Sequence, residues 1–260
     1  MTIANQLAPQ HTKAEVKFAS EGYIYALESC GTVDGPGVRF IVFTTGCPLR
    51  CQYCHNVDSF QLENGELRKT EDIIEEISGY TNFLKAAKGG ITISGGEPLM
   101  QPEFTHAILR GAKKMGLHTA LDTTGFLGKK ASDELLADVD LVLLDIKSFT
   151  PDLYKKVTGA NIKPTLDFAR RLDAMSKPVW LRFVLVPGLT DDVENMEQLA
   201  DFLATLSNLE RFEILPFHKM GEHKWKNVPL KYQLANTKPT SAEQMDFAKS
   251  IFAKRNILSS

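Results

Sequence analysis

Six short apolar runs, each followed by an amphipathic helical pattern, restrict the folds that this chain of 260 residues can adopt. Such runs suit strands covered on both faces, as in a parallel sheet with helices packed against it. The runs occupy residues 38–43, 91–94, 119–122, 141–146, 179–186 and 211–215. The helical patterns occupy residues 70–87, 103–115, 132–137, 165–175, 193–206 and 241–254. The alternation predicts an α/β domain with a parallel sheet, and leaves open whether that sheet is doubly wound, a barrel or a partial barrel.

Composition and charge exclude several classes of protein. Hydrophobic residues make up 43% of the chain and charged residues 24%, which are ordinary values for a globular protein. The formal net charge of -2 argues against nucleic acid as a partner, because phosphate binding usually requires a basic excess. No apolar run approaches the roughly 20 residues that span a bilayer, so no membrane association is expected. The first residues lack the pattern of a signal peptide, which predicts a cytoplasmic protein with reduced thiols.

Three of the four cysteines crowd into one short segment, Cys47, Cys51 and Cys54, with the pattern C-x3-C-x2-C. Three thiolates in one loop can converge on a soft metal centre. A [4Fe–4S] cluster normally takes four cysteines, so three would leave one iron open to a substrate or cofactor. The alternative is a structural zinc site, completed by His55 or by the upstream Cys30.

Polar or glycine-rich groups follow the other predicted strands. Each of them alone is compatible with a tight turn, a helix cap or a surface residue. Because parallel strands place their carboxyl ends at one edge, we expect these groups to surround a single cavity together with the cysteines. They are Gly95 and Gly96, Asp122 and Thr123, Asp145 and Lys147, Arg182, and His218.

The cysteine motif followed by Ser94-Gly95-Gly96-Glu97-Pro98 resembles the radical S-adenosylmethionine (SAM) enzymes. Residues 28–37, ESCGTVDGPG, and residues 53–56, YCHN, are similar to the glycyl-radical enzyme activating family within that superfamily. The similarity extends over nearly the whole chain from about Tyr23. It implies a partial (β/α)6 TIM-like barrel as a radical SAM core domain over residues 21–260. Residues 1–20 are polar and lack periodicity, so we expect them to form a flexible extension.

The resemblance also implies roles for individual residues. Cys47, Cys51 and Cys54 would bind a [4Fe–4S] cluster. Lys147 would balance the carboxylate of SAM, and Asp34 would lie near the incoming glycine of the protein substrate. A monovalent cation would be held beside SAM by Asp122, Thr123 and Asp145. The residues implied to contact SAM are Tyr53, Cys54, His55, Asn56, Gly96, Asp145, Ile146, Lys147, Arg182 and His218.

The activity implied by the resemblance is hydrogen abstraction from a partner protein. Flavodoxin or ferredoxin would reduce the cluster, SAM would yield a 5′-deoxyadenosyl radical, and that radical would take a Cα hydrogen from a glycine of a glycyl-radical enzyme. The segment between Cys54 and Ser94 contains no cysteine, which disfavours relatives with an inserted ferredoxin-like domain and favours pyruvate formate-lyase as the partner. A monomer is expected. Alternatives are an activase of another glycyl-radical enzyme, a radical SAM enzyme for a small molecule, an electron carrier, or a zinc or iron–sulfur binding module.

Overall fold

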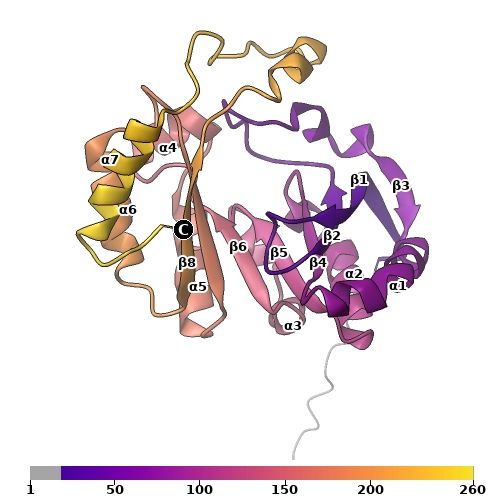
Figure 1. The fold of residues 1–260 in the computed structure, drawn as a ribbon. Coiled ribbons are helices and arrows are strands. Elements are labelled where there is room, and N and C mark those ends of the chain that lie inside the picture. Colours follow the sequence, from indigo (N-terminus) through magenta and orange to yellow (C-terminus); the bar gives the residue numbers. More distant parts are fainter. Residues whose placement is uncertain (1–18, 260) are drawn as a thin grey trace, which may run out of the picture.

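The sheet of this protein is open and mostly parallel, and its strands lie in the order β3-β1-β2-β4-β5-β6-β7-β8 (Figure 1). A computed structural model describes residues 19–259. Residues 1–18, which make up most of the predicted extension, lie outside the described residues. Because β3 and β8 form the two edges and do not pair with each other, the sheet is a partial barrel, as the resemblance implies.

All six predicted strands are confirmed, within one or two residues at most of their ends, and they pair in parallel. They are β2 (Arg39–Thr44), β4 (Gly90–Gly95), β5 (His118–Thr123), β6 (Leu141–Asp145), β7 (Val179–Leu185) and β8 (Leu209–Pro216).

The predicted helices are confirmed as well, and one more of eight residues, α4, ends at Gly159 in the left-handed conformation. The helices are α1 (Thr70–Ala86), α2 (Pro102–Lys114), α3 (Asp133–Ala137), α4 (Pro151–Thr158), α5 (Lys163–Ala174), α6 (Val193–Leu203) and α7 (Ala242–Ala253). In Figure 1, α1 and α2 lie at the β2–β4 side of the sheet, and α6 and α7 lie beside β8. Among the described residues, no helix is both long and apolar enough to cross a membrane.

Side chains alternate between the two faces of the sheet, and this alternation places the functional groups. On β4, Ile91 and Ile93 belong to the main apolar core. Thr92 and Ser94, one residue further along, point to the opposite face by the two-residue period of a strand. The same period puts Asp122, Asp145 and Arg182 on this opposite face, which is called the inner face here. Each of them is next to a core residue of its own strand. The inner face is therefore polar near the carboxyl ends of the strands.

Two strands were not predicted, β1 (Glu21–Gly31) and β3 (Glu66–Lys69), and both pair antiparallel at one side of the sheet. β3 is an edge strand with no buried residue, so no apolar run announces it. β1 is only half-buried and mixes polar with apolar residues. Within residues 19–259 the sheet therefore has eight strands rather than the six that the apolar runs indicate.

Candidate active site

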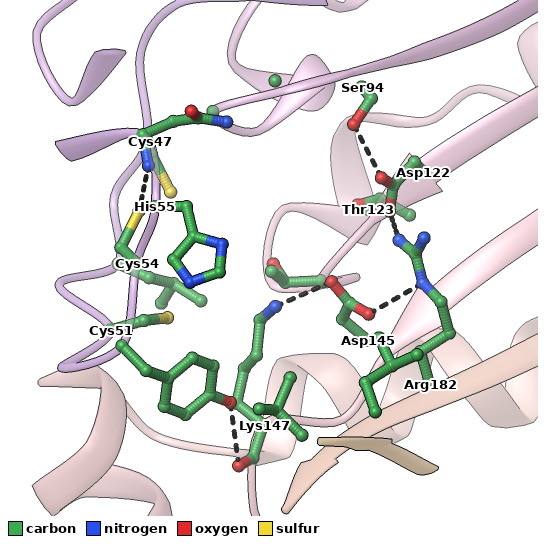
Figure 2. A pocket seen from close by; sticks show the side chains of 18 of the residues that line it. Cys47, Cys51, Cys54, His55, Ser94, Asp122, Thr123, Asp145, Lys147 and Arg182 are labelled. Carbon is green, nitrogen blue, oxygen red and sulfur yellow. Dashed lines mark hydrogen bonds and ion pairs between the residues drawn. The ribbon is translucent and has the colours of Figure 1, made fainter. Parts of the chain in front are cut away.

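A cavity of about 300 Å³ lies at the carboxyl ends of the parallel strands. All the strand-end groups named from the sequence line it, together with the three clustered cysteines. Figure 2 shows the three sulfur atoms on one side of the cavity and the charged groups of Asp122, Asp145, Lys147 and Arg182 on the other. Among the predicted site residues, those that line the cavity are Cys47, Cys51, Tyr53, Cys54, His55, Asn56, Gly96, Asp122, Thr123, Asp145, Lys147, Arg182 and His218.

The segment that carries the thiols, residues 46–56, is called the cysteine loop here and is fixed by backbone hydrogen bonds. The amide of Cys47 donates to the carbonyl of Phe60 at 3.1 Å, and the amide of Arg50 donates to the carbonyl of Thr158 at 2.8 Å. Gly96 also packs against it, because a Cβ at this position would lie 2.5 Å from the carbonyl oxygen of Gly46. Gly96, directly after β4, is thus required by the neighbouring backbone.

The segment of residues 217–240, called the covering loop here, closes over the cysteine loop from the far end of the sequence (Figure 1). The indole nitrogen of Trp225 donates to the carbonyl of Cys54 at 3.0 Å, and Lys224 donates to the side chain of Asn56 at 3.0 Å. The rings of His55 and His218 lie 4.4 Å apart between centroids. The cysteine loop is therefore held between the sheet and the covering loop.

The environment of the thiols is apolar. Burial raises the pKa of the Cys47 and Cys54 thiols, and it raises the pKa of Cys51 to about 12. Without a metal these thiols are protonated at neutral pH, and binding of iron to the thiolates releases the protons. Soft sulfur donors in a cavity of this kind suit an iron–sulfur cluster.

The zinc site that the sequence left open is not supported by the positions of its ligands. Cys30 lies exposed on β1 and does not line the cavity, so it is not placed to complete a zinc site with the other three. Within residues 19–259, no group of three or more His, Cys, Asp or Glu side chains is arranged to hold a single metal ion. In a cubane cluster each thiolate binds a different iron. The thiols therefore need to face a common cavity, but they do not need to converge on a single metal ion.

Arg182 is the centre of the charged side of the cavity. Its guanidinium donates to one carboxylate oxygen of Asp122 and, at 3.1 Å, to one of Asp145. Lys147 donates to the other oxygen of Asp145 at 2.7 Å, and Ser94 donates to the other oxygen of Asp122 at 2.6 Å. Each carboxylate oxygen of this pair of aspartates therefore has a protein donor.

These contacts set the pKa values of the group. Burial by itself would lower the pKa of Arg182 and of Lys147, but the neighbouring carboxylates outweigh it and hold both pKa values above their usual range. Burial would likewise raise the pKa of Asp145, but Arg182 and Lys147 hold it below its usual value. Arg182, Lys147 and Asp145 are thus ionised, and the charged side is internally paired before a ligand arrives.

Glu97 is a site residue that the sequence did not single out. It is fully buried and receives hydrogen bonds at 2.6 Å from the hydroxyls of Thr123 and Thr124. It also accepts a hydrogen bond from the backbone amide of Thr124 at 3.0 Å. Burial raises the pKa of Glu97 even though these bonds oppose the shift. Its side chain ties the turn after β4 to the end of β5, a contact between residues 27 positions apart that no local pattern indicates.

Two predicted site residues do not line the cavity. The side chain of Ile146 is fully buried in the apolar core, and its amide donates to the carbonyl of Arg182 at 3.2 Å. Asp34 lies in the connection between β1 and β2, and its carboxylate is 3.8 Å from the guanidinium of Arg182. Asp34 therefore touches the charged group from outside the cavity wall.

Comparison with known proteins gives consistent relatives. The sequence pattern of the Radical SAM superfamily matches residues 41–203. The pyruvate formate-lyase 1-activating enzyme of Escherichia coli (strain K12) is 42% identical over 232 residues, which are 88% of this chain and 94% of that protein. The pyruvate formate-lyase-activating enzyme of Staphylococcus epidermidis is 45% identical over 230 residues, 86% of this chain and 92% of that protein.

Solved structures share the fold. A domain of a pyruvate-formate lyase-activating enzyme from Bacteroides vulgatus superposes with a TM-score of 0.56 at 28% identity, covering 66% of this chain and 98% of that one. Streptococcus suis SuiB bound to S-adenosylmethionine superposes with a TM-score of 0.63 at 15% identity, covering 87% of this chain and 50% of that one. The second likeness concerns the fold alone.

Proposed function

Because the chain belongs to the radical SAM superfamily, within the family of the pyruvate formate-lyase activating enzymes, we propose that it forms a glycyl radical on pyruvate formate-lyase. One observation carries this proposal: three thiols and a set of paired charges face each other across a single cavity (Figure 2). With Cys47, Cys51 and Cys54 holding a [4Fe–4S] cluster and SAM bound beside it, these cofactors would supply reductive one-electron cleavage of the sulfonium C5′–S bond, using an electron from an external reductant, and thereby removal of the glycine Cα hydrogen.

The residues present fit both cofactors. Cys47, Cys51 and Cys54 would hold three irons, which leaves one iron for the amino and carboxylate groups of SAM. Lys147 lines the same cavity, and its ammonium group, which donates to Asp145, has further donors with which it would balance the SAM carboxylate. The remaining contacts to SAM would come from Tyr53, His55, Asn56, Gly96, Asp145, Ile146, Arg182 and His218.

The chain's own residues orient the reactants and exclude water. The charged groups are already paired with one another, so little rearrangement is needed when SAM binds. The cavity wall also has an apolar part, which protects a carbon radical from solvent and from side reactions. This part consists of Leu49, Phe60, Val184, Leu215 and Phe217.

A monovalent cation at Asp122, Thr123 and Asp145 is a further part of the proposal. The carboxylate oxygens already accept bonds from Arg182, Ser94 and Lys147, and the hydroxyl of Thr123 donates to Glu97. A carboxylate oxygen has more than one lone pair, so a cation would share these oxygens with their protein donors.

The partners and setting complete the proposal. A flavodoxin or ferredoxin would supply the electron, and the enzyme would act as a monomer in the cytoplasm, where thiols stay reduced. Asp34 would lie close to the glycine segment of the partner.

The decisive experiment is electron paramagnetic resonance after anoxic reconstitution. The protein is expected to hold about four irons and four sulfides per chain. Reduction with dithionite in the presence of SAM and pyruvate formate-lyase should give the doublet of a glycyl radical. Cys51→Ala should lose cluster and radical, whereas the matched control Cys30→Ala should keep both. One zinc per chain without sulfide would overturn the proposal, and a radical only on another glycyl-radical protein would change the partner.

A further inference from the structure

The connection between β1 and β2, residues 32–38, is held in place by several side-chain and backbone contacts although part of it is exposed. It precedes β2, so it lies at the amino ends of the parallel strands, whereas the cysteine loop follows β2 at their carboxyl ends. Val33 in this connection is 77% exposed, but its neighbour Asp34 turns inward to Arg182. One segment thus meets both the solvent and the charged group of the site.

Arg39, at the start of β2, is the main support of this connection. Its side chain is fully buried. It donates to the hydroxyl of Thr92 at 3.0 Å and to the carbonyl of Pro36 at 3.3 Å, and it bonds to the carbonyl of Ile91. Burial lowers the pKa of Arg39 to about 10, which is still high enough to keep the guanidinium charged. A buried charge is tolerated only when its donors are satisfied, and these carbonyl and hydroxyl groups satisfy them.

Thr92 transmits this support to Asp34. Its hydroxyl accepts from Arg39 and donates to the backbone carbonyl of Asp34 at 2.6 Å. The result is a chain of contacts from Arg39 through Thr92 to Asp34, and from the carboxylate of Asp34 to Arg182. Arg182 in turn holds Asp122 and Asp145 in the cavity.

Close backbone packing leaves the connection little freedom to shift. Gly37 has a φ of +67°, and a Cβ there would lie 2.3 Å from the carbonyl oxygen of Lys88. A Cβ at Gly89 would lie 1.7 Å from the carbonyl oxygen of Val38. The connection and residues 88–89, which precede β4, therefore touch through their main chains. This contact lets Arg39 bond both to the connection and to the first residues of β4.

We infer that Arg39 and Thr92 are positioning residues for the protein substrate: they hold residues 32–38 so that Asp34 stays against Arg182 and the partner's glycine segment meets a prearranged surface. This inference rests on the proposed function. A fixed surface binds an extended peptide without first having to be ordered, which favours affinity. Neither residue lines the cavity, and Arg182 keeps its own bonds to Asp122 and Asp145, so we expect the loss of either residue to affect the partner rather than SAM.

The test is Thr92→Val, which removes the hydroxyl and nearly preserves the volume. In reconstituted enzyme with pyruvate formate-lyase, we expect the KM for the partner to rise about tenfold, since the loosened connection must then be ordered as the partner binds. Formation of 5′-deoxyadenosine without partner should stay unchanged. The matched control is Thr165→Val, another fully buried threonine, whose hydroxyl bonds to Tyr154 at 3.1 Å. It should leave both quantities unchanged.

Thr92→Ser, which keeps the hydroxyl, should restore the wild-type KM. Arg39→Lys, which keeps the charge but loses the planar fork, should raise the KM in the same direction as Thr92→Val. An unchanged KM in Thr92→Val, an equal loss of partner-free SAM cleavage, or a raised KM in Thr92→Ser would overturn the inference. If wild-type enzyme cleaves SAM but forms no glycyl radical on the partner, the proposed function fails instead.

Discussion

The two sides of the cavity differ in what they need from a ligand. On the cysteine side, buried thiols with raised pKa values have no charge to offer until a metal displaces their protons. On the opposite side, Arg182 and Lys147 already neutralise Asp122 and Asp145. The cysteine side thus needs its cofactor, whereas the charged side is already paired within the fold. Mutations on the cysteine side should therefore reduce activity, and mutations on the charged side should reduce stability.

The largest effect on activity is expected from the cysteine side. Cys54→Ala removes one thiol from a loop that is otherwise held by backbone bonds and by Trp225. Cluster binding and SAM cleavage should be abolished, while the metal-free protein should keep its circular dichroism spectrum and its unfolding midpoint within error. Loss of the fold in the metal-free variant would show that the thiol side also supports the structure.

The largest effect on stability is expected from the charged side. Arg182→Gln leaves two largely buried carboxylates without their common partner, and breaking such a pair costs about 3–5 kcal/mol of unfolding free energy. Urea unfolding of the metal-free protein measures this. Lys163→Gln breaks an exposed pair with Asp167 and serves as the control, with an expected change below about 1 kcal/mol. Similar losses in both variants would contradict the comparison.

A smaller loss is expected when the turn after β4 is detached from β5. Glu97→Leu leaves the hydroxyls of Thr123 and Thr124 without their acceptor, and we expect a total loss of about 1–3 kcal/mol, because removing a fully buried carboxyl group offsets part of the cost. The Kd of the cluster-loaded protein for SAM should rise because Gly96 and Thr123 line the cavity. Calorimetric titration with SAM checks this, with Glu103→Leu on the exposed surface as the control. A loss of stability with unchanged SAM affinity would confine Glu97 to folding.

The last effect is confined to part of the pH range and comes from Asp34. Burial, with a contribution from Asp122, raises the pKa of Asp34 to about 6. A carboxyl group whose pKa is raised in the fold favours folding while it is protonated, and this contribution is lost as pH rises from about 4 to about 6. The stability of the Asp34→Asn variant relative to wild type should therefore increase over this interval and then level off above pH 7. Urea midpoints at closely spaced pH values measure it, and a flat difference would argue against the raised pKa.

Much of the site could be predicted because its residues stand at strand ends. Asp122, Asp145 and Arg182 follow from the two-residue period of buried strands, and the cysteines follow from their spacing. The partners of Glu97 and Trp225 could not be predicted, because their contacts join segments that are remote in the sequence. The two antiparallel strands were missed because exposed or half-buried strands lack a continuous apolar run.

The sequence by itself determined the parallel strands, the alternation of their faces and the spacing of the thiols, since these depend on local periodicity and on neighbouring residues. Tertiary structure alone decided that Arg39 is buried beside Thr92, that Arg182 joins three aspartates, and that the covering loop reaches Cys54. The physical reason is that a buried charge or polar group is stable only with partners, and those partners are brought to it by the folding of distant strands.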